Sequence, residues 1–372
     1  MDVPLLIFSN TRVDSDLRYL IGAHVPDDIA IVFDGVQMTA LASALEINRL
    51  RNESKISSFI GLDSVKASMK SDKITSCDLL SRFLNDLGLK KICVKRNFPI
   101  YLADKLRASG FEIVVLEFSI LPQRLVKSDA EIMEIRSAIG IVAKIFAQVE
   151  KILADSSVNG KNELVYGGEI LTSERLRSIM DSECYRLGAL AEDTIVSCGL
   201  DACDPHCVGH GPLRAGEFIL IDFFPHLRSS GYYADVSRTF VKGKPSGNQI
   251  GLYETVKLAH DMAIETICDG CSLDNTMEKV FAHFEANGYN SSKISNPPRG
   301  MFHSLGHGLG LDIHEPPRLD FGDDILKAGM VVTVEPGLYY REIGGVRIED
   351  DILVREKSCE ILGTIPYNWT ID

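Results

Sequence analysis

The chain has 372 residues, which exceeds a typical single domain and favours two domains. Its 45% hydrophobic and 24% charged residues are ordinary for a globular protein, and a formal net charge of -13 argues against nucleic acid or an anionic membrane as the main partner. Nine cysteines without disulfide-framework spacing, no signal-peptide pattern and no apolar run of membrane-spanning length predict a protein of the reducing cytoplasm.

Short apolar runs alternate with helical stretches in the first third of the chain, which predicts a small layered α/β domain over residues 1–122. The expected strands are Leu5–Phe8, Ala30–Phe33, Phe59–Leu62, Lys91–Val94 and Glu112–Leu116. The expected helices are Met38–Leu50, Cys77–Leu87 and a third that stops at Gly110. Residues 121–124 have the character of a linker, and a second domain is expected over residues 123–372.

The second domain is expected to open with a long helix, Asp129–Leu153, because apolar residues recur there at helical spacing. Ser128 and Glu131 form the pattern of a capping box at its start. The other expected helices are Ser173–Glu192, Ile250–Cys268 and Leu273–Ala286, and the last two are each followed by a glycine.

The expected strands of this domain are Phe218–Phe223, Ala234–Val241, Met330–Glu335, Val346–Val354 and Glu360–Thr364. The first two are separated by a turn region, so they should form a hairpin-like pair. Helix pairs followed by strand pairs occur twice, which indicates an internal pseudo-repeat.

Four acidic residues lie on or beside these strands. Asp222 ends the run I-L-I-D, Asp235 follows thirteen residues later, and Glu335 and Glu349 close two β-branched runs. Buried carboxylates repel one another unless a cation or a proton intervenes. With one imidazole, four carboxylates can hold two divalent ions in a nearly neutral site. Such oxygen-rich ligation favours manganese, cobalt or zinc, and a pair of ions suits hydrolysis.

The motifs G-H-G-L-G-L-D-I-H-E-P-P, V-E-P-G-L-Y and G-V-R-I-E-D-D, with I-D and Y-A-D-V-S-R-T upstream, resemble the Xaa-Pro aminopeptidase and prolidase branch of the pita-bread metallopeptidases. The resemblance covers the C-terminal two-thirds strongly and the N-terminal domain weakly. It implies an α/β fold with a creatinase-like N-terminal domain and a C-terminal pita-bread catalytic domain. It also implies two divalent ions, with manganese favoured, and a homodimer.

The resemblance further implies roles for individual residues. Five positions would hold metal: Asp222, Asp235, His307, Glu335 and Glu349. Asp235 and Glu349 would bridge both ions, and Glu335 would also act as general base. His303 and His314 would contact substrate and assist proton transfer. His206 would lie near the proline side of the substrate, and Arg347 would steady the site.

Other interpretations of these residues stay open at this point. A histidine is often a structural residue, and His210 has no role that the resemblance assigns. Cys198, Cys203 and Cys207 together with His206 and His210 could form a zinc site, although their C-x4-C-x3-C spacing matches no standard zinc motif. Where relatives commonly have glycine, this chain has Phe224 followed by Pro225, which alters the wall beside the site.

The expected activity is hydrolysis of the bond between an N-terminal residue and a following proline. The substrate could be a longer peptide or a dipeptide, and Arg299 and Arg341 are candidates for binding a dipeptide's free carboxylate. Methionine aminopeptidase-like activity and a non-catalytic pita-bread binding protein are the alternatives. Creatinase-type hydrolysis is disfavoured because it does not use the complete ligand set.

Overall fold

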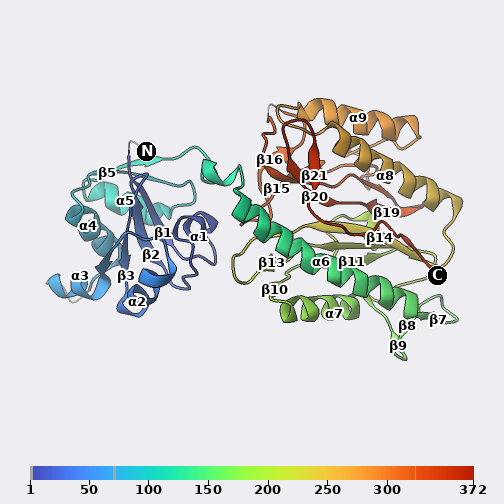
Figure 1. The fold of residues 1–372 in the computed structure, drawn as a ribbon, viewed down its shortest axis with the longest axis horizontal. Coiled ribbons are helices and arrows are strands. Elements are labelled where there is room, and N and C mark those ends of the chain that lie inside the picture. The colour runs from blue at the N-terminus through green and yellow to red at the C-terminus, as the bar shows by residue number, and fades with distance from the viewer. Residues whose placement is uncertain (1–2, 70–72, 323) are drawn as a thin grey trace. The chain divides into compact units, whose positions relative to one another are not determined.

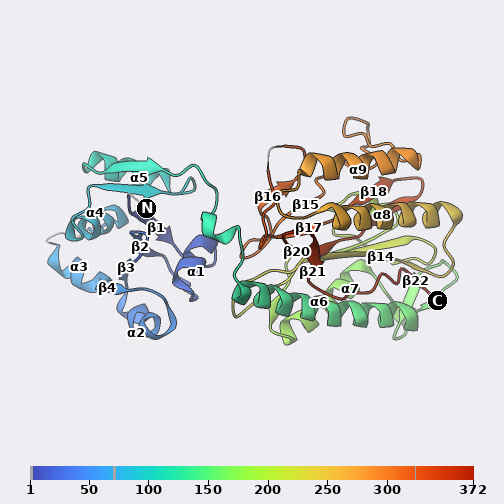
Figure 2. The ribbon, with the colours of Figure 1, turned by 45° about the horizontal axis from the view of Figure 1, so that its top comes forward.

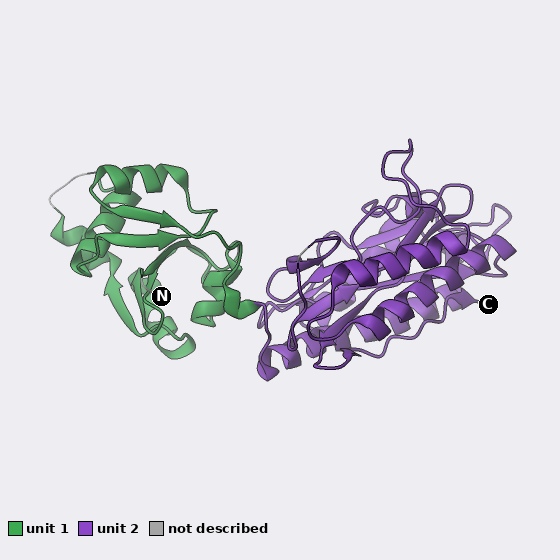
Figure 3. Cartoon of the chain, turned by 90° about the horizontal axis from the view of Figure 1, so that it is seen from above, with its two compact units in different colours: residues 1–124 green, residues 125–372 purple. Residues whose placement is uncertain are grey.

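The computed structural model describes residues 3–69, 73–322 and 324–372. The chain divides into two compact units, residues 1–124 and residues 125–372 (Figure 3). Each unit has its own hydrophobic core.

The first unit is built on a six-stranded mixed sheet. Its strands in spatial order are β4 (Ser58–Gly61), β3 (Met38–Ala42), β2 (Ile29–Phe33), β1 (Leu5–Ser9), β5 (Lys91–Val94) and β6 (Glu112–Val115). β1, β2 and β3 pair antiparallel, and the remaining pairs are parallel. The helices are α1 (Ser15–Ile21), α2 (Ala44–Glu53), α3 (Leu62–Ser68), α4 (Ser76–Asp86) and α5 (Ile100–Ala108).

Successive side chains of a strand point to opposite faces of a sheet, and β1 uses both faces. Leu5 and Ile7 pack in a cluster with residues of α1 and α2, whereas Leu6 packs in a second cluster with residues of α3, α4 and α5. The sheet is therefore covered by helices on both faces, which confirms the expected layered α/β arrangement.

The expected helix over Met38–Leu50 is wrong in its first part. Met38–Ala42 is strand β3, and α2 begins only after Ser43, its N-cap. Met38, Ala40 and Ala42 pack on one face of the sheet and Leu41 on the other. Pairing with β2 and β4 therefore outweighs the local helical preference of this segment.

The second unit contains two helix pairs with β-sheets between them. The helices are α6 (Asp129–Asp155), α7 (Ser173–Arg186), α8 (Gly247–Thr266) and α9 (Leu273–Ala286). α8 and α9 lie side by side along one side of the unit, and α6 and α7 lie along the other (Figures 1 and 2). The capping box of α6 is confirmed, because the Ser128 backbone N–H donates to Glu131 and the Glu131 N–H donates to the Ser128 hydroxyl.

α7 ends six residues earlier than the expected Glu192. The chain reverses at Gly188, which has a φ of 93°, a value that favours glycine. Within the described residues, no helix combines the length and the apolar character needed to cross a membrane.

Two larger sheets lie between the helix pairs. One has the order β11 (Ile195–Cys198), β12 (Phe218–Phe223), β14 (Val236–Lys242), β22 (Thr370–Ile371). The other has the order β16 (Glu315–Leu319), β15 (Gly306–Gly308), β17 (Val331–Val334), β20 (Asp350–Val354), β21 (Cys359–Ile361). Smaller sheets pair β18 (Gly337–Tyr340) with β19 (Gly344–Arg347), β10 (Ala189–Leu190) with β13 (His226–Leu227), and β8 (Leu164–Tyr166) with both β7 (Ser157–Val158) and β9 (Glu169–Ile170). Two short 3-10 helices are η1 (Pro122–Arg124) and η2 (Asp201–Cys203).

The antiparallel pairing of β12 with β14 confirms the expected hairpin-like pair. The single strand expected over Val346–Val354 is wrong, because the segment forms two strands in different sheets. β19 pairs with β18, and β20 pairs with β17. The chain changes sheets at Ile348 and Glu349, so the carboxylate of Glu349 lies at the point of crossing.

Candidate metal centre

A cavity of about 740 Å³ lies among the strands that carry the acidic and histidine motifs. The residues expected to hold metal all line it: Asp222, Asp235, His307, Glu335 and Glu349. So do the residues expected to contact substrate or steady the site: His206, His303, His314 and Arg347. Phe224 is also part of the wall, whereas His210, Arg299 and Arg341 are not among the lining residues.

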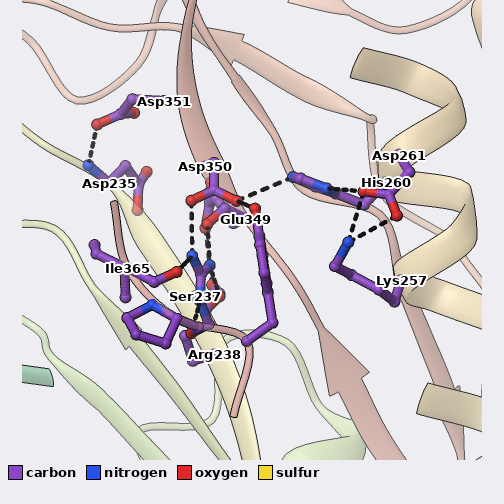
Figure 4. A network of polar contacts seen from close by, with 12 residues as sticks. Asp235, Ser237, Arg238, Lys257, His260, Asp261, Glu349, Asp350, Asp351 and Ile365 are labelled. Carbon is purple, nitrogen blue, oxygen red and sulfur yellow. Dashed lines mark hydrogen bonds and ion pairs between the residues drawn. The ribbon is translucent and has the colours of Figure 1, made fainter. Parts of the chain in front are cut away.

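Strands β12 and β14 place the two aspartates. Asp222 lies on β12 directly opposite Ser237 on β14, and Asp235 immediately precedes β14. The backbone N–H of Asp235 donates to Asp351 Oδ2 at 2.9 Å, which fixes the loop at its entry to the strand (Figure 4). Both carboxylates therefore project from one small patch of the four-stranded sheet.

The five-stranded sheet places His307 and Glu335. His307 is the middle residue of β15, and its backbone N–H donates to Thr333 Oγ1 on β17 at 3.1 Å. Glu335 follows β17, and its N–H donates to the carbonyl of Leu305 at 2.8 Å. His307 Nε2 lies 3.5 Å from Asp235 Oδ2 and 3.8 Å from Glu335 Oε1. The imidazole of His307 therefore lies next to one carboxylate from the side of the four-stranded sheet and one from the five-stranded sheet.

The glycines beside His307 let the neighbouring chains approach closely. A Cβ on Gly306 would lie 2.1 Å from the carbonyl oxygen of Thr333, and one on Gly308 would lie 2.4 Å from that of Pro316. Real Cβ atoms do not approach oxygen this closely, so a side chain at either position would push β15 away from its neighbours. The close packing of β15 against its neighbours therefore requires glycine at both positions.

Ser237 connects the carboxylates behind the cavity, and we assigned it no role from sequence. Its hydroxyl lies 3.0 Å from Asp222 Oδ1 and 2.8 Å from Glu349 Oε2, and it accepts from Arg347 Nε at 2.9 Å. A hydroxyl has one proton to donate, so it cannot satisfy both carboxylates at once. The carboxylates of Asp222 and Glu349 therefore need a further positive charge or a proton to be fully compensated.

The pKa values of the carboxylates also indicate that the site lacks a compensating positive charge. Burial, together with the charges of neighbouring carboxylates, raises the pKa of Asp235 and of Glu349 well above the usual range. Burial also raises the pKa of Glu335 to about 8. Asp235 Oδ1 is buried and has no hydrogen-bond partner among the described residues. A divalent cation would relieve both the repulsion and the missing partner.

His307, Asp235 and Glu349 meet the geometric condition for sharing an ion. One donor atom from each lies within 4.8 Å of the others, and all three residues are buried. Burial lowers the pKa of His307 to about 4, so the imidazole is neutral at physiological pH and can act as a ligand. The residues present therefore fit divalent metal.

Arg347 is buried behind Asp222, and its donors contact protein groups. It donates to Asp222 Oδ2 at 2.7 Å, to the Ser237 hydroxyl at 2.9 Å and to the Tyr339 hydroxyl at 3.0 Å. These bonds hold Asp222 and Ser237 in place, so the observed contacts of Arg347 are those of a supporting residue.

His303 is held between protein groups at both ring nitrogens. Nδ1 lies 2.7 Å from the carbonyl of Ser304, and Nε2 lies 2.9 Å from the hydroxyl of Tyr339. A neutral ring that donates from Nδ1 and accepts at Nε2 satisfies both contacts. Burial and the nearby Arg347 lower the pKa of His303 to about 3, which keeps the ring neutral. Tyr339 is a second supporting residue that sequence did not reveal.

His314 and His206 border the cavity and are both exposed. The ring of His314 meets the edge of His307, with centroids 4.4 Å apart. Arg318, on β16, also lines the cavity and is exposed. Arg299 and Arg341, the candidates from sequence, are not among the residues that line the cavity.

The loop that carries His314 is tied to a buried ion pair. Lys127 Nζ lies 2.9 Å from Glu315 Oε2, and both side chains are almost completely buried. The other oxygen of Glu315 accepts from the N–H groups of Leu311 and Asp312 at 3.0 and 3.2 Å. Glu315 therefore shapes the turn before His314 and is paired with the buried Lys127.

Lys127→Met should lower the free energy of unfolding by about 3 kcal/mol, because it removes one partner of a buried ion pair. Adding Glu315→Gln should recover part of that loss, since glutamine keeps an acceptor for the turn without the charge. Urea unfolding of the three variants measures both effects. Lys91→Met, which breaks an exposed pair with Glu112, is the matched control and should cost at most about 0.5 kcal/mol. A double variant less stable than Lys127→Met would contradict this reasoning.

A network of polar groups lies directly behind the acidic residues (Figure 4). Asp350 accepts from Arg238 Nη2 at 2.8 Å and from the Tyr367 hydroxyl at 2.7 Å, and it lies 3.2 Å from His260 Nε2. His260 Nδ1 lies 3.6 Å from Asp261. His260 is fully buried on α8, so the network links that helix to β14 and β20.

His260 should make the stability of the protein depend on pH. Burial alone would lower its pKa, but the carboxylates of Asp261 and Asp350 outweigh both burial and the charge of Arg238, so the pKa lies above 6.5. The folded state then holds the proton more tightly than the unfolded state. The stabilisation is complete below the unfolded pKa of about 6.5 and is lost as pH rises through the higher folded value.

We therefore expect the difference in unfolding free energy between wild type and His260→Gln to shrink as pH rises from about 6 to about 9. Urea unfolding at each pH measures it. A difference that stays constant, or that grows with pH, would show that His260 is not charged in the folded protein.

A set of four carboxylates and one imidazole that are buried or partly buried, with exposed histidines around an open cavity, is typical of metal-dependent hydrolases. Residues 133–356 match the profile of metallopeptidase family M24. The Xaa-Pro dipeptidase of Pyrococcus horikoshii is 31% identical over 283 residues, which cover 74% of this chain and 73% of that protein. The chain belongs to metallopeptidase family M24 and is a metal-dependent peptidase.

Solved structures share the fold over nearly the whole chain. The X-Pro aminopeptidase from Thermotoga maritima superimposes with a TM-score of 0.82 at 22% identity and covers 99% of this chain and 97% of its own. The prolidase from Pyrococcus horikoshii superimposes with a TM-score of 0.78 at 26% identity, and the match covers 98% of this chain and 94% of that protein. The expected pita-bread architecture is therefore confirmed, and the family implies that divalent metal binds.

Proposed function

We propose that the cavity is a dinuclear metal site that hydrolyses the bond between an N-terminal residue and a following proline. The proposed ligands are Asp222, Asp235, His307, Glu335 and Glu349. The observation that carries the proposal is their convergence on one cavity, with Asp235 Oδ1 buried and partnerless. The Xaa-Pro specificity of relatives from two genera supports the choice of substrate.

The bound ions would polarise the scissile carbonyl and lower the pKa of a water. Glu335 is proposed to take a proton from that water and pass it to the leaving proline nitrogen as the carbon–nitrogen bond breaks. Arg347 and Ser237 hold Asp222 and Glu349 in place during these steps. His314 and His206 border the open side of the cavity and would contact the substrate, whereas His303 is proposed to act together with Tyr339.

Arg318 is proposed to decide between dipeptides and longer peptides, because it is the guanidinium that lines the cavity from an exposed position. A dipeptide presents a free carboxylate close to the reacting bond, and arginine binds carboxylates with paired hydrogen bonds. A longer peptide has an amide at that place. A dipeptidase would therefore depend on Arg318 more strongly than an aminopeptidase.

The test compares kcat/KM on an Xaa-Pro dipeptide, an Xaa-Pro-Xaa tripeptide and a Met-Ala-Xaa tripeptide, with manganese, cobalt or zinc added to metal-free protein. Proline at position two should be required with every ion. Arg318→Gln should reduce kcat/KM on the dipeptide by roughly 10-fold to 100-fold and leave the tripeptide within about 3-fold. Preference for the Met-Ala peptide would instead favour methionine aminopeptidase-like activity. Hydrolysis of none of them would favour a binding protein.

A further inference from the structure

A second group of metal-binding side chains lies on the loop between β11 and β12. One donor atom each from Asp201, Cys207 and His210 lies within 4.8 Å of the others. None of the three lines the cavity of the candidate metal centre. We propose that they form a separate binding site for a zinc-like divalent ion, which closes the loop around His206.

The distances converge on a single atom of the imidazole. His210 Nδ1 lies 3.5 Å from Asp201 Oδ2 and 4.0 Å from Cys207 Sγ. Ligands around tetrahedral zinc lie roughly 3.3–3.6 Å from one another, given metal–ligand bonds of roughly 2.0–2.3 Å. The third pair of donor atoms, from Asp201 and Cys207, lies within 4.8 Å. The three atoms would therefore have to draw closer together to reach that geometry, and a water would complete it.

The backbone already holds the three residues near these positions. The N–H of His210 donates to Asp201 Oδ2 at 3.1 Å, and the hydroxyl of Ser197 donates to the carbonyl of Cys207 at 2.6 Å. Gly209 lies so close to β11 that a Cβ there would be 1.8 Å from the carbonyl oxygen of Val196. The loop is therefore held against β11 at Cys207 and at Gly209, and little ordering is needed to bind an ion.

Of the three cysteines in this segment, Cys207 is the one whose sulfur lies close to the other two donor atoms. Burial raises the pKa of Cys198 to about 12 and that of Cys203 to about 11, so both are thiols in the metal-free protein. Neither belongs to the group of converging donor atoms. The site consequently replaces the five-residue zinc site considered from sequence with Asp201, Cys207 and His210.

The donor set indicates the chemistry of the ion. One thiolate, one imidazole and one carboxylate suit zinc better than manganese, which prefers oxygen ligands. Binding would release the thiol proton of Cys207 to solvent. The exposed position of His210 leaves room for an ion to enter.

The location suggests what the ion would do. His206 lies in the chain between Asp201 and Cys207, and it lines the cavity with Pro205. An ion held at both ends of this short segment would restrict its movement. The proposed function is not required for this inference, because the two sites share no residue.

Cobalt spectroscopy can separate the two sites. The candidate metal centre has no thiolate, so a thiolate-to-cobalt charge-transfer band in the near ultraviolet can come only from a cysteine site. We expect metal-free, reduced protein titrated with Co²⁺ to develop this band. Cys207→Ser should abolish it, and the matched control Cys203→Ser should retain it in full.

His210→Ala should weaken Co²⁺ binding at this site by at least about 10-fold, since it removes the ligand on which the others converge. The band should persist in Asp235→Ala, which is altered only at the candidate metal centre. Circular dichroism would verify that each variant is folded. Absence of the band in wild type at saturating Co²⁺, or its survival in Cys207→Ser, would overturn the proposal whatever the peptidase activity.

Discussion

Glu349→Ala and Asp235→Ala should each reduce kcat/KM on an Xaa-Pro substrate by at least about 1,000-fold. Both carboxylates are buried in the cavity and are proposed to contact both ions, so their loss removes metal as well as charge. Metal catalysis contributes several kcal/mol, and each 1.4 kcal/mol corresponds to about a factor of ten in rate. Steady-state kinetics at saturating metal, with metal content measured on the same samples, gives both quantities.

A stability measurement separates this effect from misfolding. In the metal-free protein Asp235 is a buried carboxylate with an unpaired oxygen, surrounded by other carboxylates. Metal-free Asp235→Ala should therefore be as stable as metal-free wild type, or more stable, despite its inactivity. Glu278→Gln, an exposed change on α9, is the control and should leave activity unchanged. Unchanged peptide cleavage in both alanine variants, with no divalent metal bound, would refute the peptidase assignment of these residues.

Arg238→Met should lower the free energy of unfolding by at least about 5 kcal/mol, since charge-assisted hydrogen bonds contribute about 1.5–3 kcal/mol each. Arg238 is 1% exposed. Its guanidinium donates to the carbonyls of Ser237, Glu349, Ile365 and Pro366 and to Asp350, with distances between 2.7 and 3.1 Å. The five N–H groups of the guanidinium therefore donate to five acceptors, and the methionine variant leaves all five acceptors without this donor.

Arg238→Lys tests whether a positive charge alone, without the guanidinium's hydrogen bonds, is sufficient for stability. Lysine has three donors on one atom and cannot span acceptors on three segments of chain, so it should recover less than half of the lost stability. Arg186→Met, which breaks a surface pair with Glu183, is the matched control and should leave the free energy of unfolding nearly unchanged. Chemical denaturation with tryptophan fluorescence can follow all three variants. If Arg238→Lys were as stable as wild type, the five hydrogen bonds of the guanidinium would not be what stabilises the fold.

Local patterns predicted most elements of the fold. α9 and β12 have the expected bounds, and α6 begins at the expected capping box. These elements carry their own signals in residue spacing, caps and terminal glycines. The errors at β3 and at Glu349 arose because the outcome there depends on strands that are distant in the sequence. β3 is a strand because β2 and β4 flank it, and the crossing at Glu349 exists because β19 and β20 pair with different strands.

The candidate site shows the same division. The acidic and histidine residues that line the cavity could be selected in advance, because their types and flanking motifs indicate metal chemistry. Apart from Arg347, the residues that support them could not be selected. Ser237, Tyr339 and Arg238 are ordinary residues in a strand until the fold places their hydrogen-bonding groups against carboxylates and backbone carbonyls. Arg318 is one arginine among many until β16 brings it to the cavity.

The division of the proposed ligands between two sheets has a consequence for how the protein opens. Asp222 and Asp235 come from the four-stranded sheet, and His307 and Glu335 come from the five-stranded sheet. Ions bound to both would act as a cross-link within the native state and would have no equivalent binding site in the unfolded chain. Each sheet could then exchange its amide protons independently in the presence of a chelator, whereas loaded protein would protect both sheets as a single cooperative block.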